Sequence, residues 1–215
     1  EIKNPLTPIQ LTIDRIKEKY SNQILDNDQE NFKENLKIIN NQNKQIENLV
    51  NEFSDFARMP KPILKDNDLI KILNESIKLL SELDNSIKID LTKNKDEILL
   101  NCDKEQIARV FINLIKNSIE SIEEKSKKIT NFEKKISIEI LQNNDHIKIT
   151  LLDNGLGFSE IKGRIKDILN PYFTTKKNGT GLGLSIVNKI INDHNGELNF
   201  FSINDGAKIE IIFRL

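Results

Sequence analysis

The sequence predicts an α+β protein in which an N-terminal helical hairpin precedes a two-layer α/β sandwich. Before Pro60, apolar residues recur at intervals of three and four, the spacing of helices that pack along a seam. Beyond Pro62 the chain changes to short mixed segments, and residues 136–140 and 147–151 alternate apolar and polar side chains as half-buried strands do. Helices that cover one face of such strands and leave the other wet form a two-layer sandwich.

Length and composition narrow the class of protein. The chain has 215 residues, of which 37% are hydrophobic, enough for about one to two domains with a modest core. A net charge of −1 gives no electrostatic reason to expect nucleic acid or an anionic membrane as a partner. The single cysteine, Cys102, excludes an internal disulfide framework and a Cys-rich metal site, which fits a reducing compartment.

Two helices are predicted before the prolines. The first spans Leu6 to Tyr20, and after a polar stretch the second runs from about Phe32 to Ala57. Two helices alone leave much of each seam wet, so a four-helix bundle made by two chains is favoured, and packing on the C-terminal part is the alternative. Asn43, a polar residue on the second seam, is expected to fix the register of that bundle.

The prolines predict the domain boundary. Pro60 and Pro62 each push the preceding residue out of the α region and so end the second helix. We therefore expect a helical domain over 1–59 and a sandwich domain over 60–215. In the second domain the pattern predicts strands at 63–65, 87–91, 97–100, 136–140 and 147–151, helices at 68–83, from Asp103, at 160–169 and up to Asn195, and two final strands.

A glycine-rich loop is the first candidate binding feature. Gly179, Gly181 and Gly183 lead directly into the apolar helix that begins near Leu184. Glycines let a backbone approach a ligand closely, and the free N–H groups of a helix start attract anions, so phosphate is the expected guest. Further donors precede the helix at Thr174, Thr175, Lys176 and Thr180. A flexible connector is the alternative reading of the glycines.

Two polar motifs lie outside this loop. Asn113 and Asn117 are stacked one turn apart on the helix after Asp103, away from its apolar face, and their oxygens suit Mg²⁺ and phosphates. Asp153 ends a predicted strand before Gly155 and Gly157, where its carboxylate can accept from an exocyclic amine and the glycines make room for a flat ring. Surface solvation of the asparagines and an ordinary tight turn at Asp153 are the alternatives.

Taken together, the motifs Asn-x-x-x-Asn, Asp-x-Gly-x-Gly and Phe-Thr-Thr-Lys followed by Gly-x-Gly-x-Gly resemble the nucleotide-binding boxes of sensor histidine kinases. The resemblance runs from Asp103 to the C-terminus and implies the ATP-binding fold shared with gyrase, the Hsp90 chaperone and MutL. Residues 1–8 are similar to the segment that follows the phosphoacceptor histidine in the dimerisation domain of this family. Residues 52–60 are similar to the end of that domain in nitrogen-regulation kinases of the NtrY type.

The resemblance implies roles for individual residues. Asp153 would accept from the adenine amine, Asn113 would coordinate Mg²⁺, and Asn117 would support the metal and the phosphates. Glu1 would polarise the acceptor histidine for attack on the γ-phosphate, and Asn4 would position water in the reverse phosphatase reaction. Arg109 is a weaker candidate for phosphate. The other ATP-binding positions are Gly155, Gly157, Phe173, Thr174, Thr175, Lys176, Gly179, Thr180, Gly181, Leu182, Gly183 and Leu184.

The implied activity is that of an ATP-dependent protein-histidine kinase in two-component signal transduction. ATP and Mg²⁺ are the expected cofactors, and a second copy through residues 1–57 and a response-regulator receiver domain are the expected partners. The histidine expected just before Glu1 is not in this chain, which we interpret as a fragment unable to label itself. A conformational ATPase of the same fold and a non-catalytic dimeric scaffold stay open. We expect the fragment to be cytoplasmic and without membrane contact, and an inner-membrane anchor elsewhere in the intact protein stays open.

Overall fold

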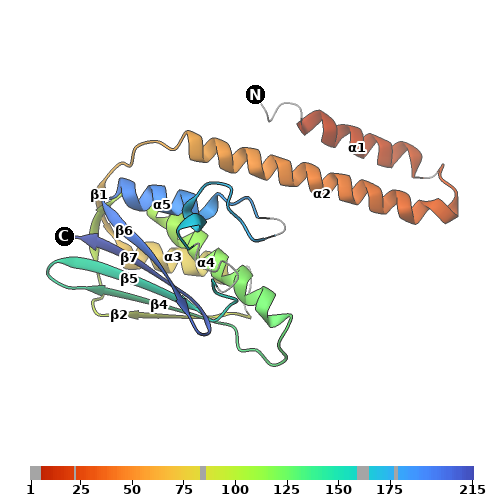
Figure 1. The fold of residues 1–215 in the computed structure, drawn as a ribbon. Helices are drawn as coiled ribbons and strands as arrows, with labels where there is room; N and C mark the ends of the chain where they lie inside the picture. The colour runs from red at the N-terminus through yellow and green to blue at the C-terminus, as the bar shows by residue number, and fades with distance from the viewer. Residues whose placement is uncertain (1–5, 22, 83–85, 159–164, 177–178) are drawn as a thin grey trace. The chain divides into compact units, whose positions relative to one another are not determined.

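The computed structural model describes residues 6–21, 23–82, 86–158, 165–176 and 179–215 (Figure 1). The chain divides into two compact units. The helical unit consists of residues 1–59 and 175–180, and the α/β unit of residues 60–174 and 181–215. Among the described helices, none is both long enough and apolar enough to cross a bilayer.

The helical unit contains the two predicted helices, α1 (Leu6–Tyr20) and α2 (Asp26–Ala57). The second helix begins earlier than the hydrophobic pattern indicates, at Asp26 rather than near Phe32. Asn43 of α2 is 6% exposed, and its Nδ2 donates to the Leu6 carbonyl and to Gln10 Oε1, both at 3.3 Å. This buried carboxamide therefore ties α2 to the first turn of α1 within one chain.

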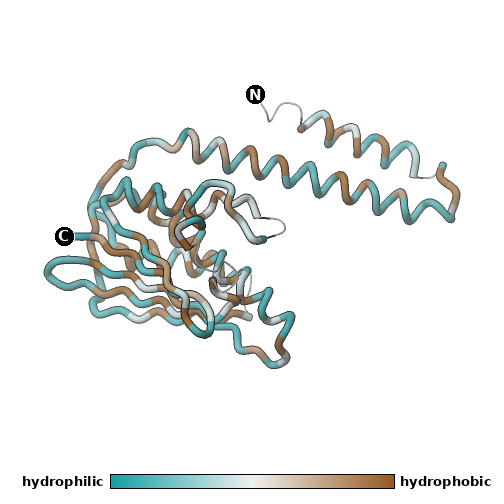
Figure 2. The backbone as a smooth tube through the Cα atoms, in the orientation of Figure 1, coloured by the Kyte–Doolittle hydropathy of each residue, from teal (hydrophilic) through white to brown (hydrophobic). Residues whose placement is uncertain are grey.

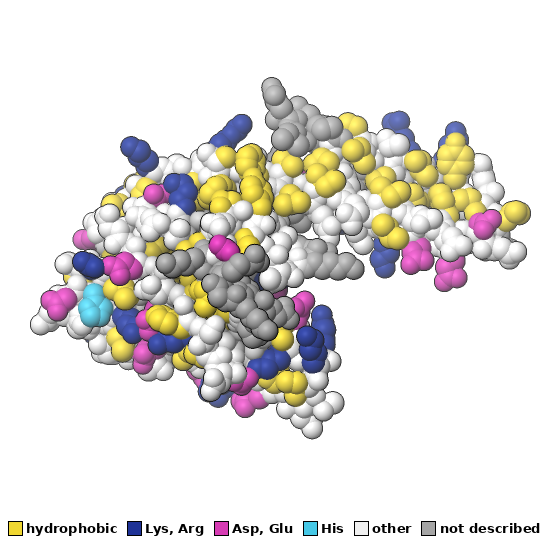
Figure 3. Space-filling view, viewed as in Figure 1, with side chains coloured by type: hydrophobic (Ala, Val, Ile, Leu, Met, Phe, Trp, Pro, Cys, Tyr) yellow, Lys and Arg dark blue, Asp and Glu magenta, His cyan; other side chains and the backbone are white. Residues whose placement is uncertain are grey.

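A row of apolar side chains on the helical unit stays in contact with solvent. The space-filling view shows hydrophobic atoms gathered along the hairpin, and the hydropathy tube shows the same alternation along α2 (Figures 2 and 3). We call these side chains the exposed stripe; it comprises Ile9, Ile39, Ile46, Leu49 and Phe53, each at least 38% exposed. One hairpin alone thus leaves about half of its own seam uncovered.

The α/β unit has short strands and three longer helices. In chain order its described elements are β1 (Lys65–Asp68), α3 (Leu69–Ser81), β2 (Lys88–Lys93), β3 (Leu99–Cys102), α4 (Lys104–Ser126), β4 (Lys135–Gln142), β5 (His146–Asp153), the 3-10 helix η2 (Ile165–Leu169), α5 (Gly183–Asp193), β6 (Gly196–Ile203) and β7 (Gly206–Arg214). The α+β class expected from the sequence is confirmed. The strand predicted at 63–65 is displaced, because pairing with β3 begins only at Lys65.

The main sheet of the described residues has five strands in the order β2-β4-β5-β7-β6, and β1 pairs with β3 separately. The antiparallel pair predicted from alternation is present as β4 and β5, with Ile138 opposite Leu151. Pairing of β2 with β4 is parallel, which the sequence did not predict. Helices α3, α4 and α5 cover one face of this sheet, so the buried residues of alternating strands meet the apolar faces of the helices (Figure 1).

Polar groups fix where α4 begins. Asp103 at its N-cap accepts from the Glu105 and Gln106 amides at 3.1 Å, and its second oxygen accepts from the Ile63 amide at 2.9 Å. Burial opposes ionisation of Asp103, but these three amide donors outweigh it and lower the pKa of the carboxyl. Next to it, Cys102 is fully buried, which raises the pKa of its thiol to about 11 and leaves it a small core residue.

Candidate nucleotide site

Asp153, the last residue of β5, is a buried acid with several donors around it. It is 5% exposed; Oδ1 accepts from the Gly155 amide at 2.9 Å and Oδ2 accepts from Ser118 Oγ at 2.9 Å. The Ala207 amide also donates to the carboxylate. Burial raises the pKa of Asp153 against the lowering effect of these donors. Since a carboxylate has about four lone-pair sites, the arrangement leaves room for one more donor.

The loop after Asp153 is packed so closely that its glycines cannot carry side chains. A Cβ on Gly155 would lie 2.4 Å from Ser121 Oγ, and a Cβ on Gly157 would lie 2.2 Å from the Gly206 carbonyl oxygen. Gly157 also has a φ of +66°, a conformation that glycine adopts without strain. Substitution at either glycine would therefore push the loop away from α4 or from the β6–β7 turn.

Helix α4 also carries the two predicted carboxamides. Asn113 and Asn117 are half-buried, and a Cβ placed on Gly183 would lie 3.7 Å from Asn113 Oδ1 and 3.9 Å from Asn117 Nδ2. The structure therefore brings both side chains against the first residue of α5. Leu182 is the N-cap of α5, and its side chain makes no cap hydrogen bond. Carboxamide oxygens beside helix-start amides are suited to a metal-bound phosphate group.

One helix connects the two ends of this candidate site. Ser118, which donates to Asp153, directly follows Asn117, and it lies five residues after Asn113 on α4. At about 1.5 Å per residue, the carboxamide group and the Asp153 contact are separated by roughly 2–8 Å along the helix axis. The arrangement therefore has a buried carboxylate at one end and two carboxamides beside a helix start at the other.

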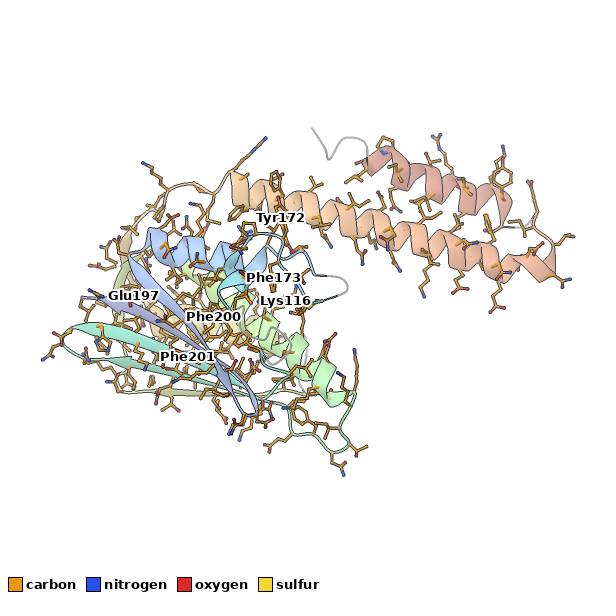
Figure 4. All side chains as sticks on the ribbon, in the orientation of Figure 1. Lys116, Tyr172, Phe173, Glu197, Phe200 and Phe201 are labelled. Carbon is orange, nitrogen blue, oxygen red and sulfur yellow. The ribbon has the colours of Figure 1, made fainter. Side chains whose placement is uncertain are left out.

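The two ends of the loop before α5 meet at Tyr172 and Gly181. Tyr172 donates its amide to the Gly181 carbonyl at 3.0 Å, and a Cβ on Gly181, where φ is +69°, would lie 2.4 Å from the Tyr172 carbonyl carbon. Phe173 follows Tyr172 and is half-buried (Figure 4). Glycine at 181 is thus required by the close approach of the two ends of the loop.

The predicted site residues fall into three groups. The α/β unit brings Asp153, Gly155 and Gly157 together, and it places Asn113 and Asn117 beside Gly183. Thr175, Lys176, Gly179 and Thr180 belong to the helical unit by their contacts. Glu1 and Asn4 lie outside the described residues. The positions 173, 174, 181, 182 and 184 are in the α/β unit, as is Arg109.

Three α4 residues at this site were not predicted. Ser118 donates to Asp153, Ser121 Oγ accepts from the Leu156 amide at 2.9 Å, and Lys125 donates to the carbonyls of Asn154 and Gly155. One signal was available: Ser118 is a hydroxyl on the otherwise apolar face of the helix, where an unpaired polar group would be costly. Nothing in the local pattern distinguishes Lys125 from a solvated lysine.

An apolar cavity in the core is separate from this site. The cavity between α3, α4 and the sheet, lined by Leu73, Phe111 and Ile138 among others, has almost no polar surface and is part of the core. Among the described residues, no three His, Cys, Asp or Glu side chains form a metal-binding group.

The chain is similar to known proteins in both units. Residues 102–215 match the family described as histidine kinase-, DNA gyrase B-, and HSP90-like ATPase, and residues 1–62 match the His Kinase A (phospho-acceptor) domain. A protein of Rickettsia bellii named as an NtrY-like sensor histidine kinase is 38% identical, with 100% of this chain and 34% of the relative covered. The nitrogen regulation protein NtrY of Azorhizobium caulinodans is 34% identical, with 100% and 27% covered.

A solved structure agrees with these similarities. The histidine kinase ThkA, solved in complex with the response regulator protein TrrA, is 26% identical with a TM-score of 0.69, and 100% of this chain and 58% of that chain are covered. The present chain spans about a third of the length of the Rickettsia bellii relative.

Proposed function

The chain belongs to the sensor histidine kinase family, and from this premise we propose that it is the kinase core that binds Mg-ATP and passes the γ-phosphate to a histidine. The phosphoryl group would then go to an aspartate of a response regulator. The observation that carries the proposal is that α4 contacts the buried Asp153 carboxylate through Ser118 and places Asn113 and Asn117 beside the start of α5. This combination suits a purine amine at one end and a metal-bound triphosphate at the other.

In this proposal each residue holds one part of the nucleotide. Asp153 accepts from the adenine amine, and Gly155 and Gly157 let the ring lie against the backbone. Asn113 ligates Mg²⁺ and Asn117 supports the ion and the phosphates. The amides and hydroxyls of the loop, with Lys176, hold the phosphate end. When bound, the ion would neutralise phosphate charge, while the residues named above would hold the nucleotide in position.

Adenine recognition is tested by replacing Asp153. Asp153→Ala removes a charge-assisted hydrogen bond worth about 1.5–3 kcal/mol, so the Kd for Mg-ATP should rise about 10- to 100-fold in calorimetric titration. Asp145→Ala is the matched control, because Asp145 is exposed and lies roughly 26 Å away at the other end of β5. Equal affinities of wild type and Asp153→Ala would exclude the adenine assignment.

The metal assignment has its own test. Asn113→Ala should abolish the Mg²⁺-dependent part of ATP affinity, and Asn113→Asp should keep or strengthen it because a carboxylate is a better ligand for Mg²⁺. Asn199→Ala, on an exposed position of β6, serves as the control. If Mg²⁺ strengthens ATP binding equally in wild type and Asn113→Ala, the ion lies elsewhere.

A conformational ATPase of the same fold is the runner-up. A rapid ATPase needs a base that activates water, and the Asn113 carboxamide cannot take a proton near neutral pH. We therefore expect bound ATP to be hydrolysed slowly, which preserves the γ-phosphate for transfer. A pure scaffold is the third reading, and it would show no need for nucleotide, so the measured ATP affinity separates it from both.

The acceptor is proposed to be a histidine just before Glu1, with Glu1 polarising it and Asn4 serving the reverse reaction. The two histidines of this chain are poor acceptors. His194 is 7% exposed, with Nε2 accepting from the Asp103 amide at 3.0 Å and Nδ1 within 2.7 Å of the Ile190 carbonyl. His146 begins β5, at the end of the strand away from Asp153. Residues 1–215 should thus bind Mg-ATP without labelling themselves.

The proposed partners are a second copy and a receiver domain. The exposed stripe on α1 and α2 provides an apolar face for a homodimer through residues 1–57, and it is the feature that supports this assignment. The ThkA structure is a complex with a response regulator, and we propose a partner of that class here. We also propose that this part of the protein works in the cytoplasm without membrane contact, and that any inner-membrane anchor lies in the rest of the longer protein.

A further inference from the structure

Lys125, near the C-terminal end of α4, has a more specific environment than a solvated lysine. Its side chain is 14% exposed. Nζ donates to the Asn154 carbonyl at 2.8 Å, to the Gly155 carbonyl at 3.0 Å and to the Asp205 carboxylate. An ammonium has three N–H donors, so these three acceptors use all of them. The same nitrogen lies 5.2 Å from the centre of the Phe132 ring, a favourable position for a cation.

These contacts give the loop after Asp153 partners that the sheet cannot provide. Asn154 and Gly155 lie beyond the end of β5, so their carbonyls have left the strand ladder. A buried carbonyl without a donor is costly, and Lys125 supplies a charged donor to both. The C-terminal end of a helix also attracts a cation, which favours the ammonium at this position of α4.

Lys125 completes a series of contacts along one face of α4. Ser118, Ser121 and Lys125 are three and four residues apart, and residues at this spacing lie on the same side of a helix. Ser118 holds the Asp153 carboxylate, Ser121 accepts from the Leu156 amide, and Lys125 holds the two carbonyls between them. Helix α4 thus holds the Asp153 carboxylate, the Leu156 amide and the two carbonyls between them in place.

Asp205 extends this arrangement to the β6–β7 turn. It is the residue before Gly206, which has a φ of +114° and whose added Cβ would lie 1.8 Å from the Asp153 carbonyl oxygen. The turn therefore presses directly on the strand end that carries the acid. Through Asp205, Lys125 joins α4, the loop and this turn into one cluster behind Asp153.

We infer that Lys125 is a positioning residue for the nucleotide base, acting through the Asn154–Gly155 backbone rather than by touching the ligand. It holds the loop so that the Asp153 carboxylate and the glycine backbone meet an adenine ring in one fixed geometry. The inference rests on the proposed function, since it presumes that Asp153 accepts from the base. Loss of Lys125 should therefore affect discrimination between bases and leave binding of the phosphate chain unchanged.

The test compares Lys125→Met with wild type in the full chain. Lys125→Met keeps the length of the side chain but has no donor, and its Kd for Mg-ATP should rise about tenfold, because the loop would no longer hold the Asp153 carboxylate in one geometry. The preference for ATP over GTP should narrow by a similar factor, and the affinity for magnesium tripolyphosphate should not change. Lys127→Met is the matched control, because Lys127 is an exposed lysine at the C-cap of the same helix.

Two further variants test the inference independently of folding defects. Lys125→Arg retains a charged multiple donor and should restore most of the ATP preference. Asp205→Asn removes one charged partner and should raise hydrogen exchange at the Gly155 and Leu156 amides, even if Lys125→Met does not fold. Unchanged base preference in Lys125→Met, or unchanged exchange in Asp205→Asn, would overturn the inference. Failure of the wild-type chain to bind ATP would instead overturn the proposed function.

Discussion

The two units of this chain cover their apolar side chains to different extents. In the α/β unit, helices cover the sheet so completely that Ile136 and Ile140 are 0% exposed. In the helical unit, Ile39, Ile46 and Phe53 remain 48%, 45% and 44% exposed. Both sets of side chains are apolar and lie on regular elements. Only the first set finds its covering surface within one chain.

This difference indicates how each unit is stabilised. Burial of apolar surface contributes about 25 cal/mol per Å², so the α/β unit gains its stability within the single chain. In the proposed homodimer the helical unit gains a comparable contribution from a second copy, and its stability should therefore depend on concentration. Separating the two units tests most strongly whether the α/β unit is stable alone while the helical unit needs a partner.

The largest effect is expected when the chain is cut at Pro60. Residues 60–215 should remain a folded monomer that binds ATP, because their core is complete without the hairpin. Residues 1–59 should lose most of their helical signal on dilution, as two helices alone do not cover their seams. Circular dichroism and light scattering over a dilution series measure both. A hairpin that stays helical as a monomer would show that the exposed stripe needs no partner.

The next largest effects are expected from truncating one apolar side chain in each unit. Leu114→Ala should destabilise the α/β unit by about 2–5 kcal/mol, because Leu114 is 1% exposed and its removal leaves a cavity. Ile46→Ala should leave the unfolding of residues 60–215 unchanged and weaken the dimer about tenfold. Chemical denaturation and sedimentation measure the two effects, with Lys37→Ala as the exposed control. A dimer unaffected by Ile46→Ala would place its interface away from the exposed stripe.

A smaller effect is expected at Asn43. Asn43→Ala removes the hydrogen bonds to Leu6 and Gln10 and should cost about 0.5–1.5 kcal/mol in thermal or chemical unfolding of the hairpin. Asn43→Leu should stabilise the bundle but make its register less unique, because a seam asparagine in a coiled coil fixes the register at a cost in stability. Asn41→Ala is the control on an exposed position of the same helix. If Asn43→Ala and Asn41→Ala have the same stability, the Asn43 hydrogen bonds do not hold α1 and α2 together.

The smallest effect concerns pH, where two acids of the α/β unit act with opposite sign. The pKa of Asp103 is lowered in the folded state, so its contribution to stability is present above the unfolded value near 3.8 and is lost as pH falls below it. The pKa of Asp153 is raised, so stability falls as pH rises from 3.8 through the folded pKa. Asp153→Asn should remove the second trend and Asp103→Asn the first, as measured by urea unfolding between pH 3 and pH 7. A variant with the wild-type pH profile would contradict the assignment for that residue.

The sequence predicted features that depend on local pattern. The two helices of the hairpin, the cap at Asp103 and the β4–β5 pair all follow from spacing or capping within a few residues, and the structure has each of them. Contacts between residues far apart in the sequence were harder to predict. Ser118, Ser121 and Lys125 contact the end of β5 and the loop after it, 29 to 35 residues later in the chain. Those contacts depend on the position of α4 over the sheet rather than on any motif.

The parallel pairing of β2 and β4 was missed for a related reason. Alternation of apolar residues shows that a segment is a strand, but it does not show its neighbours or their direction. The two strands are separated by β3 and all of α4, so their pairing is set by the packing of that helix. Sequence motifs thus located the candidate site, while the residues that hold it in place required the structure.

The central proposal is that ATP bound by the α/β unit supplies a phosphoryl group to a histidine outside residues 1–215. Incubation with γ-labelled ATP tests this directly, with residues 1–215 alone and with a chain extended upstream to include a histidine before Glu1. We expect acid-labile label only on the extended chain, and the label should persist when His146 and His194 are replaced by glutamine. Label on residues 1–215 that is lost on replacing His146 or His194 would contradict both the acceptor and the site geometry proposed here.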